Sequence, residues 1–170
     1  LFDGLFIPNP ETGLPEPNLA TWTVSDDGTV YTFTLLEGLK WSDGEPITSA
    51  DVKFTYDAIV SDKVESPHKT AIGSIVSVDV VDDRTVTVTL KSPDCTIWGS
   101  LGGFSALTPL PSHLYAADFS DFMTNPNNLA PTATSGAFMF DSYSSGEYVR
   151  LTANPNCCPD LIELRPQGAA

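Results

Sequence analysis

Basic residues are scarce in this 170-residue sequence, and their scarcity excludes one class of partner. Eight Lys and Arg residues stand against 22 Asp and Glu residues, so the formal net charge is −14 at pH 7. A surface of that sign repels nucleic-acid phosphates and anionic membranes. The acidic residues are scattered through predicted turns instead of gathered in one run, which is typical of a solvated surface. We therefore expect no nucleic-acid partner.

Long apolar runs and motifs for catalysis are also missing. No run reaches the length of about eighteen apolar residues that a membrane-spanning helix needs. The sequence holds two histidines, no Gly-x-Ser-x-Gly elbow, and neither the spacing of a calcium loop nor that of a structural zinc site. We expect no enzyme, no metal site and no cofactor. The sequence opens at Leu1 without Met or an apolar signal region, so we expect any export signal to lie upstream.

Cysteine is rare, and its spacing indicates no disulfide framework. The three cysteines are Cys95, Cys157 and Cys158. Adjacent cysteines such as the last two seldom bridge each other without strain. The cysteines therefore do not indicate a cellular compartment.

Apolar and turn-forming residues, by contrast, are plentiful. Hydrophobic residues make up 41% of the chain and aromatic residues 10%, enough for a buried core. Fourteen Pro and twelve Gly predict frequent turns between short elements. The composition therefore predicts a mixed α/β fold with more strand than helix.

The stretch from Trp22 to Tyr56 predicts two strands and a helix. Alternating apolar residues from Thr29 to Leu36 are typical of a half-buried strand, and the turn before it ends at Gly28, which can adopt positive φ. Thr48 and the acidic residue three positions later resemble a capping box. The helix that follows carries a predicted apolar stripe. Its members are Val52, Tyr56, Ile59 and Val60.

Two more hairpins are predicted further along. The first pairs residues 75–81 with 85–90, and the second pairs 135–140 with 148–153 about a turn at Ser144-Ser145-Gly146. Alternation in the first of these predicts that Val76, Val78 and Val80 face Val86, Val88 and Leu90. Helical turns are expected within 95–104 and an extended segment over 107–115. Three aromatic residues are interpreted as hairpin core: Trp22, Tyr31 and Trp41.

Several of these stretches together resemble the N-terminal region of family 5 extracytoplasmic solute-binding proteins, which deliver peptides, nickel complexes and related solutes to ABC importers. The resemblance extends from Leu1 to about Asn156, and it departs from the family pattern at Ala133 to Phe138 and at Cys157-Cys158. The matching motifs are Leu19-Ala20-Thr21-Trp22, Ser25 to Gly28, Tyr31 to Leu35, Lys40 to Pro46 and Ser49 to Val52.

The resemblance implies a type II periplasmic-binding-protein-like fold that is incomplete, with the small subdomain and part of one lobe. Residues 1–110 are then the small N-terminal subdomain of hairpins and one or two helices. Residues 111–170 are the start of a ligand-binding lobe. The family runs to several hundred residues, so we expect the sequence to be an N-terminal fragment.

Three residues are candidates for ligand contact by this resemblance. His68 follows Ser66-Pro67, where peptide-binding relatives place an aromatic residue that reaches the ligand; the alternative is an exposed loop histidine. Phe104 and Ser105 lead towards the face between the lobes, and core packing is the alternative for Phe104. Neither catalytic nor metal-binding residues are expected.

The implied function is solute capture outside the membrane for an ABC importer, with oligopeptides or dipeptides as the solute. The implied partners are that solute and the permease subunits, and the protein is expected to be a monomer. The location is periplasmic or at the cell surface, with a lipid anchor upstream as one option. Nickel complexes, haem or oligosaccharide remain alternative solutes. A signalling receptor domain and a secreted hydrolase are alternative functions.

Overall fold

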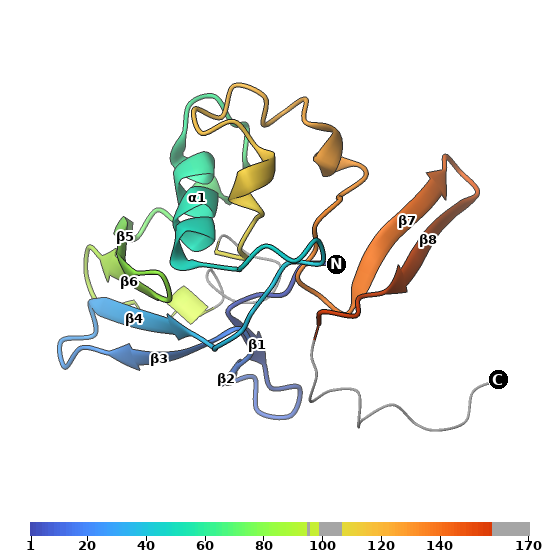
Figure 1. The fold of residues 1–170 in the computed structure, drawn as a ribbon. Coiled ribbons are helices and arrows are strands. Elements are labelled where there is room, and N and C mark those ends of the chain that lie inside the picture. Colours follow the sequence, from blue (N-terminus) through green and yellow to red (C-terminus); the bar gives the residue numbers. More distant parts are fainter. Residues whose placement is uncertain (95, 99–106, 158–170) are drawn as a thin grey trace.

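A computed structural model describes residues 1–94, 96–98 and 107–157, and within them the fold is mixed α/β and rich in strands (Figure 1). The sequence-based expectation of this class is confirmed. The strands are β1 (Phe6–Pro8), β2 (Pro15–Pro17), β3 (Ala20–Val24), β4 (Val30–Leu35), β5 (Ile75–Asp82), β6 (Thr85–Leu90), β7 (Phe138–Ser144) and β8 (Tyr148–Ala153). Helix α1 spans Ser49–Val60, and short 3-10 turns lie at Pro67–Lys69, Ser112–Leu114 and Pro126–Asn128.

The two predicted N-terminal hairpins form one antiparallel sheet of four strands, in the order β3-β4-β6-β5. β4 and β6 join the hairpins, with Phe33 opposite both Trp22 and Val86. Tyr31, Phe33 and Leu35 are buried, as the alternation predicted. Helix α1 lies against the apolar face of the sheet (Figure 1), so sheet and helix share one core.

At the start of β5, the side chain that faces β6 belongs to a different residue from the one that the alternation predicts. Ile75, not Val76, pairs with Leu90, and a β-bulge lies between Ile75 and Ser77. An extra residue in one strand shifts the alternation of side chains by one. The Val76 side chain is therefore 55% exposed, and its predicted place opposite β6 is wrong. Val78 pairs with Val88 as predicted.

Helix α1 begins at the predicted capping box. The Thr48 backbone N–H donates to Oδ2 of Asp51 at 2.9 Å, and the helix ends at Val60. Val52, Tyr56 and Ile59 are buried as expected, but Val60 is exposed and does not belong to the apolar stripe. Asp51 itself is only 3% exposed, so its remaining acceptor capacity must be used inside the protein.

Asp51 and Thr55 use that capacity to hold the segment that follows the sheet. Oδ1 of Asp51 accepts the backbone N–H and the hydroxyl of Ser112 at 3.0 and 2.7 Å. The Thr55 hydroxyl accepts the Leu110 N–H at 3.0 Å and lies 3.0 Å from the carbonyl oxygen of Thr108. These hydrogen bonds, which we call the polar seam, therefore hold residues 108–112 against the first half of α1.

Trp41 lies in a second, smaller cluster and not in the core of the hairpins. It packs with Ile47 and Ala133, and its indole N–H finds no acceptor among the described residues. The adjacent Ser42 exchanges two hydrogen bonds with Thr134, at 2.9 and 3.0 Å. Tyr31 belongs to the main core as predicted, whereas Trp22 is only half-buried beside it.

The C-terminal hairpin of β7 and β8 turns at the predicted position, with Gly146 at φ +77°. It stands apart from the four-stranded sheet (Figure 1). Its base is tied to the N-terminus, because the Gly136 N–H donates to the Leu1 carbonyl oxygen at 2.7 Å. A Cβ atom on Gly136 would lie 3.0 Å from the Leu1 backbone, so only glycine fits this approach without a shift.

Asp51→Ala should destabilise the protein strongly. Three donors from Thr48 and Ser112 would lose a buried charged acceptor, and we expect the free energy of unfolding to fall by about 2–4 kcal/mol. Urea denaturation followed by tryptophan fluorescence measures it. Asp57→Ala is the control, since its ion pair with Lys53 is at the surface and the change should stay within about 0.5 kcal/mol. Equal losses in the two variants would contradict the polar seam.

Gly136→Ala should loosen the junction between the hairpin and the N-terminus. The added methyl group must displace the Leu1 backbone, and we expect a loss of about 1–3 kcal/mol in unfolding free energy. Ser145→Ala at the exposed hairpin tip is the control and should change little. Thermal unfolding compares them, and an unchanged midpoint for Gly136→Ala would refute the close approach.

Candidate functional site

His68 is positioned by the first 3-10 turn, just beyond helix α1. Its backbone N–H donates to the Ser66 hydroxyl at 3.2 Å, which caps the turn. The carbonyl oxygen of His68 accepts the Ile72 N–H at 3.2 Å. The side chain is half-buried, so His68 is neither a core residue nor a fully exposed loop residue.

A cavity of about 250 Å³ lies beside His68. Its walls are mainly apolar, and its polar groups are hydroxyls and the imidazole of His68. The walls include Ala58, Ile59, Val64, Leu110 and Phe122. Such a cavity suits a small apolar group that carries one polar atom. The described residues bring together no group of three His, Cys, Asp or Glu side chains that could hold a metal ion.

The other two candidate residues cannot be placed beside His68. Phe104 and Ser105 lie outside the described residues, as do most of the helical turns expected within 95–104. The three candidate contacts therefore stay predictions, with only His68 located at a cavity.

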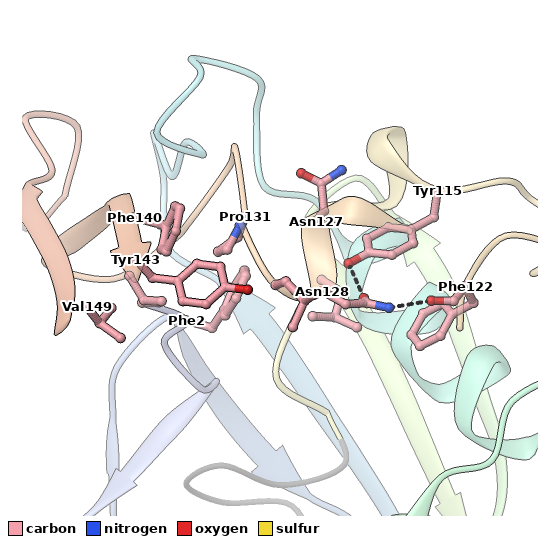
Figure 2. Close-up of a pocket in the computed structure, with 12 residues that line it drawn as sticks. Phe2, Tyr115, Phe122, Asn127, Asn128, Pro131, Phe140, Tyr143 and Val149 are labelled. Atoms are coloured by element: carbon pink, nitrogen blue, oxygen red, sulfur yellow. Dashed lines mark hydrogen bonds between the residues drawn. The ribbon is translucent and has the colours of Figure 1, made fainter. Parts of the chain in front are cut away.

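A second and larger hollow, which we call the apolar groove, was not foreseen from the sequence (Figure 2). Its volume is about 510 Å³. Phe140, Tyr143 and Val149 of the C-terminal hairpin form one side, and Tyr115 and Phe122 lie on the other (Figure 2). The signal that could have indicated it is the recurrence of aromatic residues in the last third of the sequence. Those that line the groove are Tyr115, Phe122, Phe140 and Tyr143.

The aromatic side of the groove is firmly packed. The rings of Tyr115 and Phe122 stack with centroids 5.1 Å apart, and Phe54 of α1 packs against Tyr115 at 5.8 Å. The Tyr115 hydroxyl donates to Asn128 at 3.2 Å, and the Asn128 amide donates to the Phe122 carbonyl oxygen at 2.6 Å (Figure 2). Burial raises the pKa of the Tyr115 hydroxyl, and the charge of Asp121 adds to the effect.

The lining of the groove is mainly apolar and aromatic. Among the residues that the structure describes, no charged side chain lines it, and the side-chain groups of Tyr115 and Asn128 already have partners. Asn127 and Tyr143 also line the groove and carry polar groups.

The loop between Tyr115 and Phe122 is held to the end of the helical region by one ion pair. Lys63 Nζ lies 3.0 Å from Oδ2 of Asp118. Hydrogen bonds from Ser120 and then Lys63 lower the pKa of Asp118 from 3.8 to about 2. The carboxylate is fully exposed. The ion pair therefore contributes little to the stability of the fold and mainly orients the loop.

Comparison with known proteins identifies the family. The model of bacterial extracellular solute-binding proteins, family 5 middle region, matches residues 15–159. The chain belongs to this family. Family 5 proteins bind a solute instead of converting it, so the family is not one of enzymes. Among the described residues, no helix is both long enough and apolar enough to cross a membrane.

Relatives of family 5 extend well beyond the length of this chain. A putative ABC transporter peptide-binding protein of Brucella ovis is 36% identical over 143 residues, covering 80% of this chain and 25% of the relative. The oligopeptide-binding protein AppA of Bacillus subtilis, solved with a nonapeptide, matches with a TM-score of 0.82 at 27% identity, over 92% of this chain and 31% of that chain. The chain thus spans about a quarter to a third of these relatives.

A third relative has a different ligand. NikZ of Campylobacter jejuni, solved in complex with Ni(L-His), matches with a TM-score of 0.76 at 29% identity, over 91% of this chain and 30% of that chain. Both structural relatives confirm the expected type II periplasmic-binding-protein fold for the part covered. The division at residue 110 stays a prediction.

The pKa of Asp118 gives a pH prediction. Because the folded-state pKa is lowered, the stability contributed by Asp118 is present above about pH 3.8 and is lost as the pH falls towards 2. Carbon-13 NMR titration of the Asp118 carboxyl should show a midpoint near 2. Ser120→Ala and Lys63→Ala should each raise this midpoint, because the side chains of both residues make hydrogen bonds that lower the pKa. A wild-type midpoint near 3.8 would contradict these hydrogen bonds.

Proposed function

We propose that the polypeptide carrying these residues is the extracytoplasmic solute-binding component of an ABC importer that captures oligopeptides or dipeptides. The observation that carries the proposal is the match to an oligopeptide-binding protein solved with a nonapeptide, with a TM-score of 0.82 over 92% of this chain. The peptide-binding name of the Brucella ovis relative supports the same solute class. Delivery to the permease subunits in the membrane is part of this proposal.

In this function the described residues act mainly as scaffold. Residues 1–110 serve as a small subdomain, whose sheet and α1 share one core. Residues 111–170 begin a ligand-binding lobe. Hydrogen bonds from Ser112 to Asp51 tie the start of the proposed lobe to the small subdomain. Closure of two lobes around the solute would then need no covalent chemistry.

His68, Phe104 and Ser105 are the residues that we propose to contact the solute. The cavity beside His68 supports this role for His68, because its apolar walls can take a side chain of a peptide while the imidazole reaches a polar atom. A cavity of this size accommodates one side chain of a peptide at most. It suits a protein that binds peptides of varied sequence, in which the main chain supplies most of the affinity.

The proposed location is the periplasm or the cell surface, with a lipid anchor as one means of attachment. The description of family 5 as extracellular supports it. In the structure Cys157 is disulfide-bonded, although the cysteine spacing had indicated no disulfide framework. Disulfides persist in oxidising compartments outside the cytosol, which agrees with the proposed location. We propose a monomer.

Calorimetry on the protein expressed from the whole reading frame tests the solute class. We expect heat on titration with mixtures of short peptides and none with nickel–histidine, the alternative suggested by NikZ of Campylobacter jejuni. His68→Ala should weaken peptide binding about fivefold, the effect of losing about 1 kcal/mol. Lys69→Ala, next in the same turn, is the matched control.

Two outcomes would contradict the proposal. Heat with the nickel complex alone would reject peptides as the solute, and equal affinities of the two variants would remove His68 from the site. The 170-residue chain by itself should bind peptides weakly or not at all, since it spans only 31% of the AppA chain. Micromolar affinity of this chain would show that the binding site lies within it.

A further inference from the structure

Two residues separate the cavity beside His68 from the apolar groove. Leu110 and Phe122 line both hollows, so they form the wall between them. The Leu110 backbone N–H donates to the Thr55 hydroxyl at 3.0 Å, and the ring of Phe122 stacks on that of Tyr115 with centroids 5.1 Å apart. The cavity therefore has a firmly held end wall, and part of that wall is aromatic.

The free polar groups of the cavity come from the 3-10 turn that carries His68. The Ser66 hydroxyl accepts the His68 N–H at 3.2 Å. Within the part of the chain that the structure describes, neither the hydroxyl hydrogen of Ser66 nor the imidazole of His68 has a hydrogen-bond partner. The Thr55 hydroxyl, by contrast, is already used by Leu110. One wall of the cavity therefore offers two hydrogen-bonding groups to an occupant.

The remaining lining disfavours a charged occupant. Among the described residues that line the cavity there is no Asp, Glu, Lys or Arg, and a charge that is buried without a partner is costly. Ala58, Ile59 and Val64, which form much of the wall, are themselves buried and apolar. The cavity therefore favours an uncharged group with an apolar body and one polar atom.

The size of the cavity and its aromatic wall favour a ring over an aliphatic group. A protein cavity of about 150 Å³ is large enough to hold benzene. The cavity beside His68 measures about 250 Å³, which leaves room for a benzene ring with a substituent. A ring also gains from edge-to-face or offset contact with Phe122, a gain that an aliphatic side chain lacks. The group that meets all these conditions is a phenol.

We propose that the cavity beside His68 selects an aromatic side chain of the solute, tyrosine above all, and that Phe122 determines this preference. The inference rests on the proposed capture of peptides and adds the class of side chain that is preferred. Phe122 supplies the aromatic contact, while Ser66 and His68 supply hydrogen bonds to the phenol hydroxyl. Leucine makes neither kind of contact, and lysine brings a charge that the lining does not compensate.

Calorimetry on the protein from the whole reading frame tests the preference. Tripeptides of alanine that carry one tyrosine, at each position in turn, are compared with the same peptides that carry leucine or lysine. At one position at least, we expect the tyrosine peptide to bind about tenfold more tightly than the leucine peptide, with the lysine peptide weakest. This ratio corresponds to one aromatic contact and one hydrogen bond.

Phe122→Leu tests the role of the aromatic wall. The substitution keeps an apolar side chain but removes the ring, and we expect the preference for tyrosine over leucine to fall from about tenfold to about threefold. Phe119→Leu is the matched control, because Phe119 packs on Phe54 at 5.2 Å and belongs to the lining of neither hollow. The ratio compares two peptides on one protein, so partial unfolding of a variant cancels from it.

The outcomes separate this inference from the proposed function. Heat with no peptide at all would overturn both. Equal affinities for tyrosine and leucine peptides, or a preference that Phe122→Leu leaves unchanged, would overturn the inference alone. The position of the ring has its own readout: p-cresol, the side-chain analogue of tyrosine, should cause a saturable shift of the His68 imidazole proton signals in NMR spectra. Absence of that shift would also overturn the inference.

Discussion

The buried carboxylate of Asp51 is the interaction on which the arrangement of the chain depends. One oxygen caps helix α1 through Thr48, and the other holds Ser112, sixty-one positions later in the sequence. A single residue therefore starts the helix that covers the sheet and fixes the segment that leaves it. Without this acceptor, buried donors on both segments would be unpaired, which costs more than the hydrogen bonds contribute when formed.

Around this link the protein divides into a packed part and an uncovered part. The sheet of β3 to β6 and helix α1 share a core in which Phe33, Val52 and Val86 are fully buried. The hairpin of β7 and β8 also has apolar side chains, but within residues 1–94, 96–98 and 107–157 no further strand pairs with it. The alternation of side chains is thus similar in the two places, whereas the packing around them differs.

The two cavities differ in what they can bind. The cavity beside His68 is small and carries polar atoms at its wall, as a site for part of a solute does. The apolar groove is twice as large, and none of the described residues that line it carries a charged side chain. The two linings therefore differ in chemistry as well as in size.

The sequence by itself determined the local elements and the family. The Thr48–Asp51 cap, the glycine turns and the alternation in β4 act over a few residues, so they predict helix and strand correctly. Tertiary structure decided the bulge that exposes Val76, the position of Trp41 in a second cluster, and the groove. These depend on strand register and on segments far apart in the chain, whose meeting is set by packing and pairing that no local pattern contains.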